Sequence, residues 1–115
     1  EKKNKKTFNV LKKQLTKVLE KKLNKNNIIV AYEPVWSIGT GKIPSEIELK
    51  KTTIYIKKVL KNIFKKNSPA VLYGGSVDGN NVEMFKQIKE IDGFLIGGAS
   101  KSSKKFIDII KNYYK

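Results

Sequence analysis

Three short apolar segments constrain the fold more than any other feature of the chain. They are residues 28–32, 70–73 and 93–96, and each is followed by a loop rich in glycine or proline and then by an amphipathic segment. In the first segment the apolar residues are continuous rather than alternating, which predicts a strand covered on both faces, as in a parallel sheet. Because the strands alternate with helices, the chain is predicted to be an α/β protein with right-handed parallel crossovers.

Four helices are predicted from the spacing of apolar residues, in the order α-βα-βα-βα. They lie within residues 1–26, between Ser45 and Asn67, at residues 80–88, and at about residues 103–114. Ser45 is the expected N-cap of the second helix. The last helix is expected to bury Phe106, Ile107 and Ile110.

Each predicted strand ends in a loop that carries residues capable of chemistry. Ligand sites of α/β proteins lie at the carboxyl ends of the strands, in open sheets and in barrels. The repetition favours part of a (β/α)8 barrel whose loops face one pocket. A whole barrel needs ~250 residues, whereas this chain has 115. We therefore expect residues 1–115 to be part of a single barrel domain, with two strand edges and the inner face left uncovered.

Lysine dominates the charge of the chain. All 25 cationic residues are lysine, and against 10 acidic residues they give a formal net charge of +15. Such a charge is typical of chains that bind RNA or anionic surfaces. Arginine, which makes the bidentate contacts of specific nucleic-acid readers, is absent. We therefore favour a compositionally biased, solvated surface, and keep a non-catalytic, lysine-rich binding module for RNA or anionic surfaces as the alternative.

Composition excludes several classes of function. The chain has no cysteine, which excludes disulfide frameworks, Cys-based metal sites and thiol catalysis. It also has no histidine, so a mechanism that requires an imidazole must take it from another chain or segment. No apolar run approaches the ~18 residues that a membrane-spanning helix requires.

Glu33 is the candidate catalytic residue. It follows the first predicted strand, and Pro34 keeps the residue before it extended. A carboxylate at this end of a strand can point into the pocket and act as a general base. The alternative is a surface carboxylate that happens to end a strand.

The loop after Glu33 has the composition of a lid. It starts rigidly at proline, carries large apolar residues that need cover, and has two glycines at its tip, so it could close and exclude water. The alternative is a long, ordered loop packed on the core. The lid residues, in addition to Gly39, are Pro34, Val35, Trp36, Ser37, Ile38, Thr40, Gly41 and Lys42.

Two glycine pairs follow the second and third predicted strands. They are Gly74-Gly75, before Ser76, and Gly97-Gly98, before Ala99-Ser100. Glycine lets backbone N–H groups approach an anion closely, and a helix N-terminus adds a favourable dipole. One such pair can be a simple tight turn, but two on neighbouring strands predict a phosphate site.

The segment from Ala31 to Lys42 closely resembles the active-site and lid segment of the triosephosphate isomerase family. Residues 73–77 with Asn81, and residues 92–100, resemble the family's next two phosphate-side loops, in the family's order and at about its spacing. The resemblance implies a TIM (β/α)8 barrel, of which this chain is the carboxyl-terminal portion: the last three βα units and the helix before them.

The resemblance also implies a reaction. The family interconverts dihydroxyacetone phosphate and glyceraldehyde 3-phosphate, in glycolysis and gluconeogenesis, without metal or cofactor. Glu33 matches the base that moves the proton, and Leu95 would keep water from the carboxylate and the enediolate. The residues that match the phosphate site are Gly39, Ser76, Gly97 and Gly98.

The resemblance further implies that part of the active site lies elsewhere. The family takes a lysine and a histidine from its first half to polarise the carbonyl. We therefore expect these 115 residues to be inactive alone and to need the amino-terminal half. The full-length form is expected to be a cytoplasmic homodimer, or one in an organelle such as a plastid, without a membrane or nucleic-acid partner. The far end of the lid reads Lys42-Ile43-Pro44, where the family commonly has Lys-Thr-Ala.

Overall fold

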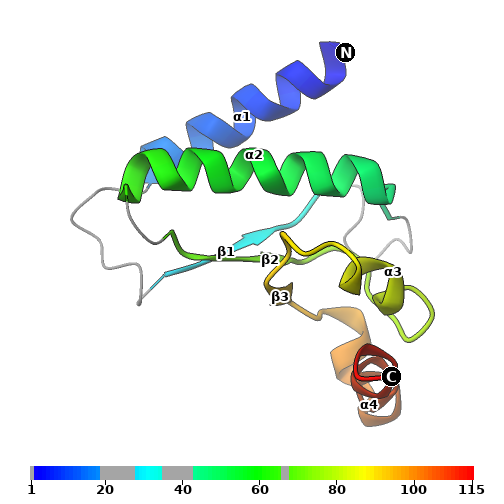
Figure 1. Ribbon diagram of the computed structural model, residues 1–115. Coiled ribbons are helices and arrows are strands. Elements are labelled where there is room, and N and C mark those ends of the chain that lie inside the picture. The colour runs from blue at the N-terminus through cyan, green and yellow to red at the C-terminus, as the bar shows by residue number, and fades with distance from the viewer. Residues whose placement is uncertain (1, 19–27, 35–42, 66–67) are drawn as a thin grey trace.

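The computed structural model describes residues 2–18, 28–34, 43–65 and 68–115, which form a three-stranded sheet with helices between the strands (Figure 1). This arrangement confirms the α/β class and the predicted order of elements. The elements are α1 (Lys2–Val18), β1 (Ile29–Tyr32), α2 (Glu46–Phe64), β2 (Ala70–Tyr73), α3 (Val82–Lys86), β3 (Gly93–Phe94), the 3-10 helix η3 (Gly98–Lys101) and α4 (Ser103–Tyr113).

The sheet is parallel and has the order β1-β2-β3. Tyr32 of β1 pairs with Tyr73 of β2, and Tyr73 pairs with Phe94 of β3. β3 is shorter than the predicted segment 93–96. The Leu95 N–H still donates to the Tyr73 carbonyl at 3.0 Å, so the chain stays beside β2 for one more residue.

Asp92 ties the start of β3 to β2 and α2. Its N–H donates to the Val71 carbonyl at 2.9 Å, and its carboxylate accepts the Val71 N–H at 2.8 Å. The same carboxylate lies 3.2 Å from the ammonium of Lys57 on α2. These contacts fix the register of β3 from its amino end.

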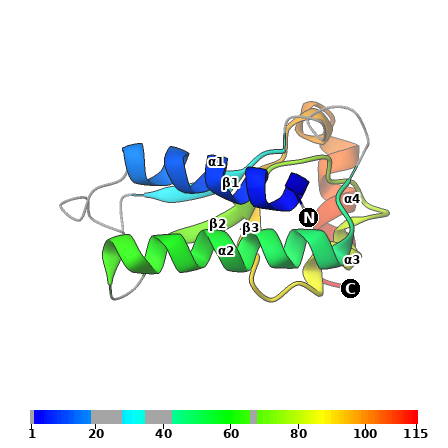
Figure 2. The same ribbon diagram turned by 90° about the horizontal axis from the view of Figure 1, so that it is seen from above.

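One face of the sheet is covered by α1 and α2, which lie side by side (Figures 1 and 2). Ile56 and Leu60 of α2 are buried against Val71 of β2. The two helices also meet through the rings of Phe8 and Tyr55, which stack with their centroids 4.4 Å apart. Of the apolar residues in the first predicted helix, Leu11 and Leu15 also pack against the cluster of Ile56, Leu60 and Val71. Residues 19–27 lie outside the described part of the chain.

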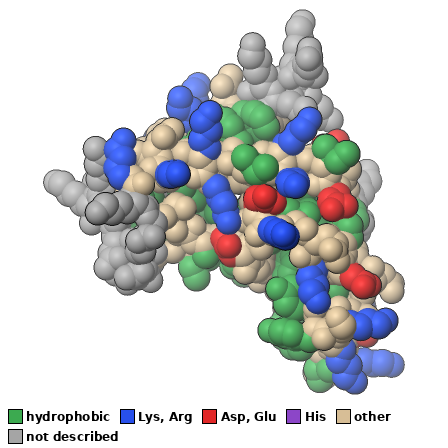
Figure 3. All heavy atoms as spheres, in the orientation of Figure 1, with side chains coloured by type: hydrophobic (Ala, Val, Ile, Leu, Met, Phe, Trp, Pro, Cys, Tyr) green, Lys and Arg blue, Asp and Glu red, His purple; other side chains and the backbone are tan. Residues whose placement is uncertain are grey.

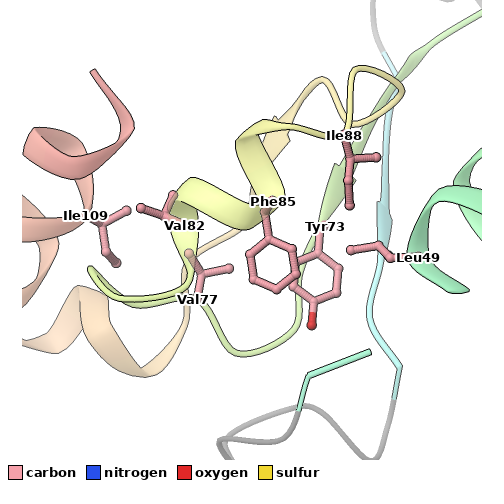
Figure 4. Packing of buried hydrophobic residues seen from close by; sticks show 7 residues of the cluster. All are labelled: Leu49, Tyr73, Val77, Val82, Phe85, Ile88 and Ile109. Carbon is pink, nitrogen blue, oxygen red and sulfur yellow. The ribbon is translucent and has the colours of Figure 1, made fainter. Parts of the chain in front are cut away.

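A second cluster fills the space between β2, α2, α3 and α4 (Figure 4). The ring of Tyr73 lies 4.6 Å from that of Phe85, centroid to centroid, and both side chains are buried. The other buried members are Leu49, Val77, Val82, Ile88 and Ile109. Tyr73 and Val77 thus anchor both ends of the loop that leaves β2.

The opposite face of the sheet is open. Ile29 is 68% exposed and Leu95 is 47% exposed. The prediction that the first strand is covered on both faces is therefore wrong within this chain, because no described element packs on the Ile29 side. The expected uncovered inner face is confirmed by the same exposure.

α4 differs from its prediction in the face that it buries. Phe106, Ile107 and Ile110 are 37%, 49% and 43% exposed, whereas Ile109 is buried. The prediction that the first three are buried is wrong. α4 contacts α3 and η3, and Ile109 is the residue of α4 that joins the buried cluster.

The other helix boundaries have local causes. The Ser45 hydroxyl accepts the N–H of Glu48 at 3.1 Å, which confirms Ser45 as the N-cap of α2. α3 begins at Val82 rather than at residue 80, because Asn80 and Asn81 form a turn with Asp78.

The lysines are dispersed over the surface. On the face shown in Figure 3 they are interspersed with acidic and apolar side chains rather than gathered in one patch. Within the described ranges, no helix combines the length and the apolar character needed to span a bilayer.

Candidate active site at the carboxyl ends of the strands

The carboxyl ends of the three parallel strands meet at one edge of the sheet. Extending the register by one residue places Glu33, Gly74 and Leu95 in one row across this edge. Successive side chains of a strand point to opposite faces, so this row lies on the open face that also carries Ile29. The predicted base Glu33 and the predicted water-excluding Leu95 are therefore on the same face, with β2 between their strands.

Glu33 lies directly against Gly74. A Cβ atom added to Gly74 would be 2.5 Å from Glu33 Cγ, which is closer than real Cβ contacts, and 3.0 Å from Glu33 Oε1. The Gly74 N–H donates to the Tyr32 carbonyl at 2.8 Å, so the two loops are joined at this point. The sequence assigned Gly74 to the phosphate loop. The structure gives it a further role, which is to leave room for the Glu33 side chain.

Most of the predicted lid falls outside the described residues. Residues 35–42, including the candidate phosphate ligand Gly39, are among them. Pro34 before this segment and Pro44 after it are both buried. The two ends of the predicted lid are therefore anchored by proline side chains in the body of the protein.

The loop after β2 holds Ser76 in place. Ser76 is half-buried, and its carbonyl accepts a hydrogen bond from Asn81 Nδ2 at 3.2 Å. The next residue, Val77, is buried in the second cluster. Ser76 thus lies between the open edge of the sheet and a fixed anchor.

The loop after β3 exposes both of its glycines. A Cβ atom at Gly97 or Gly98 would meet nothing within 4 Å, so the space beside each is open. The Ser100 N–H donates to the Gly97 carbonyl at 3.0 Å, and the Ser100 hydroxyl donates to the same oxygen, which starts η3. This geometry leaves access for a ligand to the backbone of the glycine pair.

Tyr32, next to Glu33 in the chain, is a partly buried titratable residue near the site. Burial raises the pKa of its hydroxyl, and the neighbouring Tyr73 and Glu48 raise it further. Tyr32 therefore remains neutral through the physiological pH range and adds no charge beside Glu33.

A cavity of about 220 Å³ lies between α1 and β1. It is lined by Leu11, Gln14, Leu15, Val30, Ala31, Tyr32, Glu33 and Ile56. The cavity runs along the outer edge of β1, which has no strand beside it among the described residues. Nothing in the sequence patterns predicted it.

The structure brings together part of the predicted site. Glu33 and Leu95 share the open face, and Ser76, Gly97 and Gly98 follow the neighbouring strands β2 and β3. The contacts of Gly74 and Asn81 were missed, although both residues stand in the recognised motifs. Among the described residues, no three acidic side chains are grouped as metal ligands would be.

Comparison with known proteins identifies the same family along the whole chain. The family model described as triosephosphate isomerase matches residues 1–113. The triosephosphate isomerase of Saccharomyces cerevisiae is 41% identical over 115 residues, which are 97% of this chain and 46% of that protein. That of Chlamydia felis is 38% identical over 110 residues, which are 93% of this chain and 43% of that protein.

A solved structure gives the same result. The crystal structure of triosephosphate isomerase from Bartonella henselae matches with a TM-score of 0.83 and 31% sequence identity. The match covers 99% of this chain and 46% of that one. This chain therefore spans about half the length of the relatives it matches, and its three βα units are part of a TIM barrel.

Proposed function

The chain belongs to the triosephosphate isomerase family, and from this premise we propose that it supplies the base, the lid and the phosphate-binding loops of an enzyme that interconverts dihydroxyacetone phosphate and glyceraldehyde 3-phosphate. The observation that carries the proposal is the contact of Glu33 with Gly74 on the open face. It puts a carboxylate on the open face at the carboxyl ends of the strands, one strand away from the loop that bears Ser76.

Glu33 acts as the base in this proposal. Its carboxylate takes the proton from the carbon beside the substrate carbonyl and returns it to the neighbouring carbon, through an enediolate. Geometry supports the assignment: the residue follows a short strand, Pro34 after it is buried, and Gly74 leaves the side chain space. A base held in this way needs no large rearrangement before proton transfer.

The phosphate group is held by backbone N–H groups and one hydroxyl. Ser76 and the N–H groups of Gly97 and Gly98 lie after adjacent strands, and Gly39 adds its N–H from the lid. The positive charge of the chain favours an anionic substrate. Leu95 and the apolar lid residues exclude water, which protects the enediolate from losing its phosphate.

The electrophile comes from outside this chain. The sequence has no histidine, and the resemblance to the family implies that the lysine and the histidine that polarise the carbonyl belong to the amino-terminal half of the barrel. The 115 residues alone are therefore inactive. The complete enzyme is a cytoplasmic or organellar homodimer that uses neither metal nor cofactor.

Substitution of Glu33 tests the proposal. Residues 1–115 are joined to the amino-terminal half of the Saccharomyces cerevisiae relative, and turnover of glyceraldehyde 3-phosphate is measured. Glu33→Gln should lower the turnover roughly a thousandfold, because a general base contributes about 10²–10⁴ in rate. The matched control is Glu83→Gln, which removes an exposed carboxylate from α3 and should leave turnover unchanged.

Two results would contradict the proposal. An active fusion that keeps its turnover with Glu33→Gln removes Glu33 from the role of base. An equal loss of turnover with Glu33→Gln and Glu83→Gln means that the effect follows from net charge rather than from the site.

A further inference from the structure

Asn81 stands at the N-cap position of α3 but does not cap it. Its side chain makes no hydrogen bond to the helix backbone, although asparagine is among the preferred capping residues. Instead, its amide reaches back into the loop that leaves β2. Asn81 Oδ1 accepts the N–H of Asp78 at 2.8 Å, and Asn81 Nδ2 donates to the Ser76 carbonyl at 3.2 Å.

The two backbone groups that Asn81 holds lie on either side of Val77. Val77 is buried in the cluster around Tyr73 and Phe85. The segment from Ser76 to Asp78 is therefore fixed from two directions: by its apolar side chain toward the core, and by the Asn81 amide along its backbone.

Asp78 in turn binds the backbone of Asn80 and Asn81. Its Oδ1 accepts the N–H groups of Asn80 and Asn81, each at 2.8 Å, and its carbonyl accepts the N–H of Val82 at 3.1 Å. Asp78 thus satisfies the N–H groups before α3, which leaves the Asn81 amide available for the loop. The helix start and the loop after β2 are bound into one unit.

The loop from Ser76 to Asn81 also contacts α4, through Gly79. A Cβ atom at Gly79 would overlap the carboxylate of Asp108, so loop and helix are in close contact there. The carboxylate of Asp108 is in turn 3.2 Å from Asn112 Nδ2. The loop is therefore held from Val77 onward by the core, by the turn at Asp78 and by α4.

Holding the Ser76 carbonyl controls what the loop presents to an anion. The peptide group is planar, so fixing this carbonyl fixes the direction of the whole Ser76–Val77 peptide. A carbonyl oxygen that faced the pocket would repel a phosphate, whereas N–H groups attract it. Asn81 keeps that oxygen occupied and directed toward its own amide.

We propose that Asn81 is a positioning residue for phosphate binding: its amide holds the Ser76–Val77 peptide so that Ser76 presents donors, and not its carbonyl, to the phosphate of the substrate. This inference rests on the function proposed above for Ser76. It adds a residue that touches no part of the substrate and acts through the loop backbone.

The test uses the 115-residue chain labelled with ¹⁵N and titrated with inorganic phosphate at constant ionic strength. In the wild-type chain, phosphate should shift the amide signals of Ser76, Gly97 and Gly98, and the Asp78 amide should be protected from hydrogen exchange. Asn81→Ala should expose the Asp78 amide and weaken phosphate binding about fivefold, the scale of one hydrogen bond. Asn80→Ala, which changes an exposed asparagine one position away, should leave the affinity unchanged.

A second pair of variants covers the case in which Asn81→Ala does not fold. Asn81→Asp keeps the oxygen that accepts from Asp78 but removes the donor to Ser76, and Asn80→Asp adds the same charge beside it. The proposal expects Asn81→Asp to bind phosphate more weakly than Asn80→Asp. A purely structural role would lower the unfolding midpoint and leave the phosphate affinity of the folded chain equal in the two.

The outcomes distinguish the proposed phosphate site from the proposed role of Asn81. If the wild-type chain binds phosphate at these amides and neither Asn81 variant differs from its Asn80 control, the role of Asn81 is overturned and the proposed function stands. If the folded wild-type chain shows no phosphate shifts at Ser76, Gly97 and Gly98, the phosphate site of the proposed function is contradicted, and the role of Asn81 with it. An unprotected Asp78 amide in the wild-type chain overturns the role of Asn81 directly.

Discussion

The two faces of the sheet differ in how completely this chain covers them. On one face, Val71 and Tyr73 are buried under α2 and α3. On the other, Ile29 and Leu95 are exposed, and the row through Leu95 also contains Gly74 and Glu33. The covered face therefore carries the buried side chains that stabilise the fold. The open face carries Glu33 and Leu95, to which the proposed reaction assigns roles.

The open face has the composition of an interior surface. A large apolar residue such as Ile29 costs free energy when it faces water, by about 25 cal/mol for each Å² of apolar area. The chain spans about half the length of its relatives and of the solved structure that it matches. We therefore interpret the open face as the part of the barrel lining that the other half covers.

The largest expected effect separates the two faces by stability. Leu60→Ala, on the covered face, should lower the free energy of unfolding of the 115-residue chain by about 2–5 kcal/mol. Ile29→Ala, on the open face, should change it by less than about 0.5 kcal/mol, because the side chain is already largely in water. Chemical denaturation of each variant measures both values.

Joining the amino-terminal half of a relative to this chain should change the destabilisation by Ile29→Ala but not that by Leu60→Ala. The cost of Ile29→Ala should then rise toward that of a core substitution, while the cost of Leu60→Ala stays the same. A cost of Ile29→Ala that is already large in the chain alone would contradict the division between the faces.

A smaller effect is expected at the row that carries Glu33. In a fusion with an amino-terminal half, Gly74→Ala should force the Glu33 side chain aside, since the new Cβ atom would meet its Cγ. Turnover should fall roughly a hundredfold, as for a base displaced by about 1 Å. The free energy of unfolding should change little, because the exposed Glu33 can rotate away. Wild-type turnover in Gly74→Ala would show that the contact does not position the base.

The smallest effect concerns alkaline pH at the covered face. The raised pKa of Tyr32 means that the unfolded chain loses this proton at a lower pH than the folded chain. The contribution of Tyr32 to stability is therefore complete below the unfolded pKa of 10.0 and declines as the pH rises above it. Tyr32→Phe should unfold less readily than wild type above pH 10, whereas Tyr114→Phe, at a 79% exposed position, should behave as wild type.

Much of the fold could be predicted because its signals are local. The order of strands and helices follows from the spacing of apolar residues. Ser45 can be identified as an N-cap because serine directly precedes the second helical pattern. Burial on α4 could not be predicted in the same way. An amphipathic helix shows an apolar stripe, but whether Phe106 or Ile109 is covered depends on which neighbours the chain supplies.

The residues of the candidate site can be proposed from the sequence, but their contacts cannot. Glu33 and the glycine pairs stand where strands end, and that position is visible in the sequence. The contact of Glu33 with Gly74 depends on the register of two strands, and the link from Asn81 to Ser76 depends on how a turn folds back. Such contacts arise only when segments distant in the chain are placed side by side.

The most direct test of the central claim is the isomerase activity of the two halves, alone and mixed. The 115-residue chain is combined with a separately produced amino-terminal half of the Saccharomyces cerevisiae relative, and conversion of glyceraldehyde 3-phosphate is followed. We predict that neither half is active alone, that the mixture is active, and that Glu33→Gln lowers the turnover of the mixture roughly a thousandfold. Turnover by the 115-residue chain alone, sensitive to Glu33→Gln, would contradict the claim that the site is completed from outside.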